Sequence, residues 1–101
     1  MRRIVFLIEI THANGNITIT GHAGYAEHGK DIVCSAISAI TQVFIESVAQ
    51  LTGDKIKSVI SAGNAVIRYT DLSEQGQLLM KSFFIGLKMI ADEYPQCVRL
   101  V

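Results

Sequence analysis

The dipeptide Asn14-Gly15 constrains the fold of this chain more than any other feature of the sequence. Both residue types tolerate positive φ, and Asn-Gly between alternating segments is the strongest local signal of a β-hairpin. The segments on either side, RIVFLIEI at residues 3–10 and NITITGH at residues 16–22, alternate apolar and polar positions as half-buried strands do. The chain is therefore predicted to open with a β-hairpin.

Two helices are predicted further along the chain. The first spans about Asp31 to Leu51, with Asp31 as its N-cap, and Thr52-Gly53 ends it. The second starts at the D-x-x-E spacing of Asp71 to Glu74 and continues to about Tyr94, where Pro95 stops it. The residues expected to be buried are Val33, Ile37, Ile40, Phe44, Val48 and Leu51 in the first helix and Leu79, Phe83, Leu87 and Ile90 in the second.

Three more strands complete the predicted order. KIKSVISAGNAVIRYT, residues 55–70, has the pattern of a second hairpin turning at Gly63-Asn64, and QCVRLV, residues 96–101, that of a short last strand. The order β-β-α-β-β-α-β predicts an α+β fold, with both helices against an antiparallel or mixed sheet. A chain of 101 residues is expected to form one domain over residues 1–101.

Composition excludes several classes of protein. Nine basic and nine acidic residues cancel, which argues against a nucleic-acid binder held by phosphate contacts. The two cysteines lie far apart and outside any C-x-x-C pair, which disfavours a structural zinc site or a disulfide framework. MRRIVFLIEI is too short for a signal peptide and is interrupted by Glu9, and no segment approaches the roughly 20 apolar residues of a membrane span. We expect a cytoplasmic protein.

The candidate chemistry lies in GHAGYAEHGKDIVCSAIS, residues 21–38. A loop from Gly21 to Lys30 leads to Cys34, predicted at the third helical position, where unpaired N–H groups and the helix dipole favour a thiolate and an oxyanion. His22 ends the second strand, and a histidine can take a thiol proton and return it to a leaving amine. The alternative is a small buried cysteine and an ordinary loop histidine.

Supporting roles are predicted for neighbouring residues. Asp31 either only caps the helix or also orients His22 or the loop, and Ser38 either lines a pocket or is a packed or back-bonded serine. Gly21 and Gly29 permit backbone conformations that a β-carbon forbids, and they suit a loop that closes over a peptide.

The remaining histidines and the second cysteine are weaker candidates. His12 is expected in the hairpin turn and in contact with solvent, and Cys97 in the core. The even spacing of His22, His28 and Cys34 matches no ligand pattern, so no metal or cofactor is expected.

The quoted residues resemble the ribosomal-processing cysteine protease family, called Prp. The resemblance rests on GHA at 21–23, Gly29, and DIVC at 31–34 followed by SAISAI, and it extends over the whole chain. Family members often have CAA or CAG where this chain has CSA, so Ser35 replaces a small apolar residue. The loop interior GYAEHGK, residues 24–30, also departs from the family.

The resemblance implies a cytoplasmic homodimer that removes a short N-terminal extension, ending in an aromatic-rich motif, from large-subunit ribosomal protein number twenty-seven. It implies a catalytic pair of His22 and Cys34, a mobile loop from Ala23 to Lys30, and supporting roles for Asp31 and Ser38. The expected reaction is acyl transfer, with the thiolate attacking the carbonyl that follows an aromatic residue. Two alternatives are a non-catalytic dimeric ribosome-associated binding module and a thiol redox sensor, which would lack a nearby resolving cysteine.

Overall fold

The computed structural model describes residues 7–21, 28–61 and 63–101, with the side chains of the first helix described from residue 32 onward. The elements are β1 (Ile8–Ala13), β2 (Asn16–Thr20), α1 (His28–Leu51), β3 (Ile56–Ser61), β4 (Asn64–Tyr69), α2 (Glu74–Glu93) and β5 (Val98–Leu100). The strands form one sheet in the order β3-β4-β2-β1-β5. Only β1 and β5 are parallel neighbours, so the sheet is mixed. The predicted α+β class and element order are confirmed.

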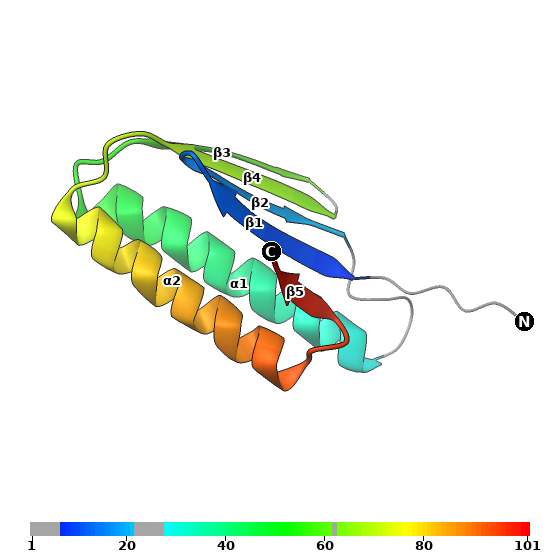
Figure 1. Cartoon of the computed structure of the whole chain (residues 1–101). Helices are drawn as coiled ribbons and strands as arrows, with labels where there is room; N and C mark the ends of the chain where they lie inside the picture. The colour runs from blue at the N-terminus through cyan, green and yellow to red at the C-terminus, as the bar shows by residue number, and fades with distance from the viewer. Residues whose placement is uncertain (1–6, 22–27, 62) are drawn as a thin grey trace, which may run out of the picture.

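Both helices connect parallel strands and lie on one face of the sheet (Figure 1). Helix α1 follows β2 and leads to β3, and the antiparallel β4 lies between those two strands. Helix α2 follows β4 and leads to β5 at the opposite edge. Connections between parallel strands of one sheet are nearly always right-handed. The α1 connection starts at β2 and moves toward the β3 edge, whereas the α2 connection starts at the antiparallel β4 and moves toward the β5 edge. Because both the strand direction and the direction of movement are reversed, the two helices lie on the same side of the sheet.

The first hairpin turns where the sequence predicts. Asn14 and Gly15 have φ values of 53° and 78°, and Ala13 pairs with Asn16. A β-carbon on Gly15 would lie 2.5 Å from the carbonyl oxygen of Tyr69, so glycine is required there for two reasons.

The turn of the second hairpin differs by one residue from the prediction. Asn64 is already the first residue of β4 and pairs with Ser61, while Gly63, with φ of 73°, comes before it. The predicted turn is displaced by one residue along the chain. Glycine and asparagine both adopt positive φ, so the sequence alone does not show which of the two lies at the centre of the turn.

Strand β3 lies at one edge of the sheet, and no other described strand pairs with its outer side. The N–H of Tyr69 donates to the carbonyl of Gly15, toward β2, at 2.9 Å. Since the backbone groups of successive residues in a strand point to opposite neighbours, the β4 residues with the same parity as Tyr69 bond toward β2, and those between them bond to β3. The β3 residues opposite Tyr69, Ile67 and Ala65 are Ile56, Ser58 and Ile60, and their backbone groups consequently point away from the sheet.

The core lies between the helices and the covered face of the sheet. Its buried hydrophobic residues are Ile8, Ile10, Ile17, Ile19, Val33, Ile37, Phe44, Val48, Ala65, Ile67, Met80, Phe83, Leu87, Cys97 and Val98. Most of the predicted helical stripes are confirmed, and Cys97 is buried as expected. Leu51 is the exception, because it is the last residue of α1 and is 68% exposed.

Helix α2 begins two residues later than its sequence motif predicts. Ser73, not Asp71, is the N-cap, and its hydroxyl accepts a hydrogen bond from the N–H of Gly76 at 3.1 Å. The carboxylate of Asp54 accepts from the Ser73 N–H and from the Ser73 hydroxyl at 2.8 Å. Asp54 lies 19 positions before Ser73, so a pattern confined to the helix start cannot reveal this contact.

Helix α1 also has the length and composition of a membrane span, contrary to the expectation from sequence. Within the described residues, Ile32–Leu51 is a 20-residue helical stretch with mean hydropathy 1.7. Four residues of this stretch, Val33, Ile37, Phe44 and Val48, belong to the hydrophobic core.

Candidate active site

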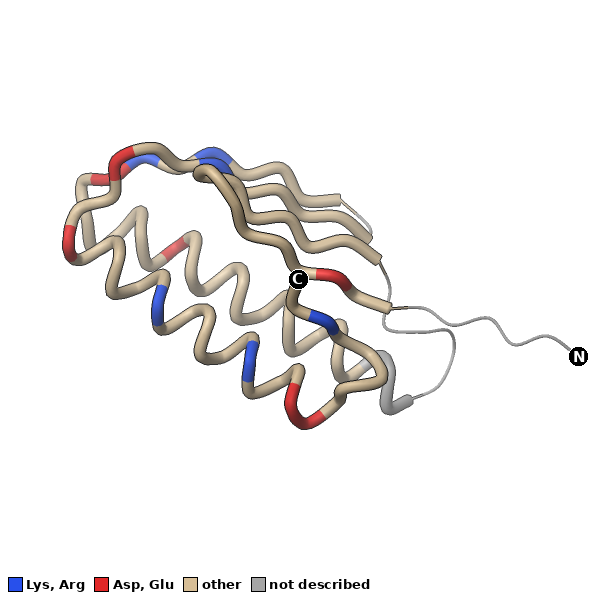
Figure 2. The backbone as a smooth tube through the Cα atoms, viewed as in Figure 1, with Lys and Arg blue, Asp and Glu red and all other residues tan. Residues whose placement is uncertain are grey.

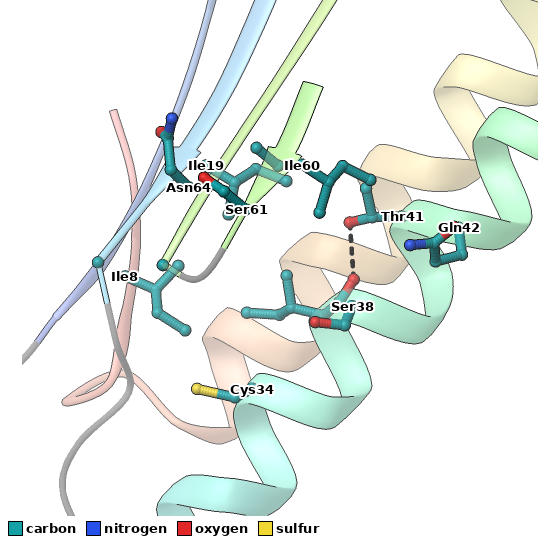
Figure 3. Close-up of a pocket in the computed structure, with 13 residues that line it drawn as sticks. Ile8, Ile19, Cys34, Ser38, Thr41, Gln42, Ile60, Ser61 and Asn64 are labelled. Carbon is teal, nitrogen blue, oxygen red and sulfur yellow. Dashed lines mark hydrogen bonds between the residues drawn. The ribbon is translucent and has the colours of Figure 1, made fainter. Parts of the chain in front are cut away.

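A cavity of about 150 Å³ lies between α1 and one end of the sheet (Figure 3). The helix contributes Cys34, Ile37, Ser38, Thr41 and Gln42, and the strand ends contribute Ile8, Ile19, Gly21, Ile60, Ser61, Gly63, Asn64 and Ala65. Segments far apart in the sequence therefore meet at this cavity, and the predicted nucleophile is among them.

Cys34 projects from α1 toward the strands (Figure 3). It is half-buried and packs against the hydrophobic core, and neither it nor Cys97 forms a disulfide. A partly exposed sulfur on a cavity wall is accessible to a substrate, which a sulfur in the centre of the core would not be. The interpretation of Cys34 as a core residue with no access to ligands is therefore disfavoured.

The predicted position of Cys34 within its helix is wrong. Helix α1 begins at His28, so Asp31 is not its N-cap and Cys34 is the seventh helical residue rather than the third. Only the first four N–H groups of a helix lack an intrahelical partner, and the effect of the dipole is strongest in that first turn. The amide of Cys34 is therefore past the turn that was expected to supply oxyanion donors.

Gly21 takes the place in the site that its position predicts. Its φ is 103°, and a β-carbon there would lie 2.2 Å from the carbonyl oxygen of Leu7, so no other residue fits without moving β1. Its N–H donates to the carbonyl of Gly63 at 2.9 Å. This bond joins the end of β2 to the turn between β3 and β4, and so fixes two walls of the cavity together.

Ser38 also lines the cavity, one turn after Cys34 on α1. It is exposed, whereas Thr41 beside it is 3% exposed and its hydroxyl donates to the carbonyl of Ile37 at 2.7 Å (Figure 3). The prediction that Ser38 faces a pocket is therefore favoured over a packed serine.

The remaining predicted site residues are described only in part. His22 and the loop residues up to position 27 lie outside the described residues, so the pairing of His22 with Cys34 stays a prediction. Gly29 and Asp31 lie within α1, with no description of the Asp31 side chain. Among the described residues, no group of three His, Cys, Asp or Glu side chains is placed to hold a metal ion.

The turn between β3 and β4 supplies cavity residues that the sequence analysis missed. Ser61 and Asn64 line the wall opposite α1, and Gln42 lies on the helix two turns beyond Cys34. Nothing local in the sequence marks these residues, because their proximity to Cys34 depends on the strand order. Helical spacing alone could have placed Gln42 on the same side of the helix as Cys34 and Ser38.

No charged side chain lines the described part of the cavity. Figure 2 shows most of the coloured charged positions at the opposite end of the sheet and along the helices, while the ends of β2, β3 and β4 beside the cavity are uncoloured. On β1 the charged Glu9 follows Ile8 and forms an ion pair with Arg99 of β5. An uncharged wall of isoleucine, serine and amide side chains suits a neutral peptide better than a phosphate or another strongly charged ligand.

His12 lies at the other end of the sheet. It is exposed on β1, its ring stacks on Phe84 with centroids 4.9 Å apart, and Nε2 forms a hydrogen bond with the hydroxyl of Tyr69. Its predicted contact with solvent is confirmed, although it belongs to the strand and not to the turn.

Comparisons with known proteins agree with this geometry. The family model for cysteine protease Prp matches residues 1–99. A ribosomal processing cysteine protease Prp from Staphylococcus aureus is 30% identical over 88 residues, which cover 84% of this chain and 83% of that protein. Crystal structures of the S. aureus protease with a substrate peptide and with a covalently linked product peptide match with TM-scores of 0.81 and 0.80, at 25% and 26% identity. The matches cover 96% and 95% of this chain and 98% and 97% of those chains. This chain belongs to the cysteine protease Prp family.

Proposed function

We propose that this protein is a cysteine endopeptidase that removes the N-terminal extension of large-subunit ribosomal protein number twenty-seven, with Cys34 as nucleophile and His22 as general base. The observation that carries the proposal is that the Cys34 side chain lines a cavity together with Gly21, the residue that directly precedes His22 in the chain, and that no described residue of its lining is charged. The related S. aureus protease has been crystallised with a substrate peptide and with a covalently linked product peptide.

The reaction is an acyl transfer in two steps. His22 takes the proton of the Cys34 thiol, the sulfur bonds to the carbonyl carbon of the scissile peptide, and the C–N bond breaks as the imidazolium returns the proton to the leaving amine. Water then gives a proton to His22 and its oxygen attacks the thioester, which releases a new carboxyl terminus and restores the thiol.

The dimensions of the cavity support cleavage after an aromatic residue. About 150 Å³ is the volume of an apolar cavity that holds benzene, so it accommodates one phenyl ring. Ile8, Ile19 and Ile37 supply apolar walls for such a ring beside Cys34.

A peptide that spans the extension junction of the ribosomal protein tests the proposal. The wild-type protein is expected to cut it once, after an aromatic residue, and Cys34→Ala and His22→Ala are each expected to lower the rate more than about a thousandfold because each removes a reacting group. Products are identified by mass spectrometry, and circular dichroism checks that the variants are folded.

Cys97→Ser serves as the cysteine control, since Cys97 is buried outside the cavity. Provided that this variant folds, it should still cut the peptide. Wild-type-like cleavage by Cys34→Ala would overturn the assignment of the nucleophile. Tight peptide binding with no cleavage by the wild-type protein, and no alkylation of Cys34, would favour the non-catalytic ribosome-associated module.

We further propose that the protein works in the cytoplasm as a homodimer that does not itself bind nucleic acid. An apolar groove between α1 and α2 supports the dimer, because Val43, Ile85 and Met89 in its lining are each more than 60% exposed. The cytoplasm is where ribosomal proteins are made, and the net charge of zero gives no general attraction to a phosphate backbone.

A further inference from the structure

We propose that Gln42 positions the substrate by hydrogen bonding to its main chain three to four residues away from the scissile bond. The inference rests on the proposed peptidase function and extends it along the cavity. Gln42 follows Cys34 by eight residues on α1, and both residues line the same cavity. At 1.5 Å per residue the two positions are about 12 Å apart along the helix axis, which an extended peptide spans in about three to four residues.

Two amide side chains that line the cavity, those of Gln42 and Asn64, make no hydrogen bond within the described part of the protein. The hydroxyl of Thr41 is bonded to Ile37, whereas the amide of the neighbouring Gln42 is exposed and makes no hydrogen bond to another described residue. The same holds for the side chain of Asn64 on the opposite wall. The donors and acceptors of these two amides are therefore available to a ligand.

Gln50 provides the contrast on the same helix. It is also exposed, but its side chain donates to Glu46 at 2.9 Å and lies outside the Cys34 cavity. Glutamine on α1 is thus found in two arrangements, one bonded to its own helix and one directed to the cavity.

The chemistry of Gln42 fits a peptide backbone. A carboxamide carries an acceptor oxygen and two N–H donors, so it can bond to the C=O and the N–H of an extended chain at the same time. The side chain of Ile60 in the same cavity is 46% exposed and offers an apolar surface for the substrate residue bound there. Recognition at this point would depend little on the identity of that side chain, because the main chain is common to all residues.

Steady-state kinetics on peptides of different length test the inference. With a peptide that extends at least five residues on both sides of the cut, Gln42→Ala is expected to raise KM about three- to tenfold, the value of one or two neutral hydrogen bonds, while kcat changes less than twofold. Gln50→Ala is the matched control and should leave both constants unchanged.

Shortened peptides then separate positioning from a structural effect. On a peptide cut back to two residues on the side that reaches Gln42, the wild-type protein and Gln42→Ala should have the same KM, whereas shortening the other side should preserve their difference. Equal KM values on the long peptide would overturn the inference, as would a KM difference that survives both truncations. If the wild-type protein cuts none of the three peptides, the proposed function fails, and the inference about Gln42 fails with it because it rests on that function.

Discussion

Asp54 holds together the start of α2 although it lies before β3 in the chain. Its carboxylate receives hydrogen bonds from the N–H and the hydroxyl of Ser73, and that hydroxyl in turn accepts from Gly76. Gly76 is buried, and a β-carbon there would lie 2.1 Å from Oδ2 of Asp54. A single carboxylate therefore links the α1–β3 connection to the N-cap of α2.

Removal of this carboxylate should weaken the folded state. Asp54→Ala is expected to lower the free energy of unfolding by about 1–3 kcal/mol, because the change leaves the donors of Ser73 without their charged acceptor. Urea denaturation followed by circular dichroism measures the change. Asp71→Ala is the control and should stay within about 0.5 kcal/mol of wild type, since Asp71 is exposed and is not the N-cap. Equal effects of the two substitutions would contradict this account.

At the scale of single residues, sequence reasoning predicted that Cys34, Gly21 and Ser38 belong to one site, and all three line one cavity. It misplaced both helix starts, because Asp31 lies inside α1, and at α2 the sequence offers both Asp71 and Ser73, which are similarly good N-cap residue types. At α2, the hydrogen bond between the Asp54 carboxylate and Ser73 favours Ser73 over Asp71 as the N-cap.

The β1–β2 hairpin is the element in which local sequence and tertiary packing impose the same requirement. Gly15 needs its positive φ for the turn and also lies against the Tyr69 carbonyl of β4. Its own carbonyl accepts from the Tyr69 N–H at 2.9 Å, so the turn is joined to the neighbouring strand.

Gly15→Ala is therefore expected to destabilise the protein by about 1–3 kcal/mol through backbone strain and a steric clash with Tyr69. Gly53→Ala is the matched control, because a β-carbon there meets no atom within 4 Å and its φ is not positive. It should change stability by less than about 0.5 kcal/mol. Thermal unfolding of the two variants side by side makes the comparison, and similar melting temperatures would argue against a special role for Gly15.

At the scale of elements, apolar periodicity and turn residues together predicted the strands and helices of the described residues, with errors at their ends. Thr52 ends α1 by bonding its hydroxyl to the carbonyl of Val48 at 2.7 Å, so Gly53 does not serve as the left-handed C-cap that its type favours. The N-terminal boundary of α1 was predicted three residues late, because HGK has no apolar residue to continue the periodic pattern. Boundaries depend on a few hydrogen bonds that periodicity does not record.

Association of whole molecules is expected to use the apolar groove between the two helices. Ile85→Lys should raise the dissociation constant of the homodimer at least about tenfold, because it would place a charge in an apolar interface. Val59→Lys is the control, since Val59 is similarly exposed, at 67% against 62% for Ile85, but lies on β3 away from this groove. Light scattering coupled to size-exclusion chromatography measures the mass across a concentration series. A wild-type protein that is monomeric at all concentrations would contradict the proposed homodimer. Dissociation caused by Val59→Lys and not by Ile85→Lys would indicate that the interface lies on β3 instead.

The three-dimensional arrangement of the cavity was the part that sequence reasoning could not reach. The fold class followed from element order, but the strand order places Asn64 and Ser61 opposite α1, and no local pattern encodes that order. The contact of Cys34 with His22 stays a prediction for a different reason, since His22 lies outside the described residues.

The outer edge of β3 affects how the folded protein behaves in concentrated solution. Natural sheets commonly protect such an edge with several charges, a proline or a bulge, but the only charge on β3 is that of Lys57. Val59 and Ile60 are exposed beside backbone groups that point away from the sheet. The described sheet therefore presents a template on which an extended segment of another molecule can be added as a sixth strand, and this edge is a site at which we expect the native protein to aggregate.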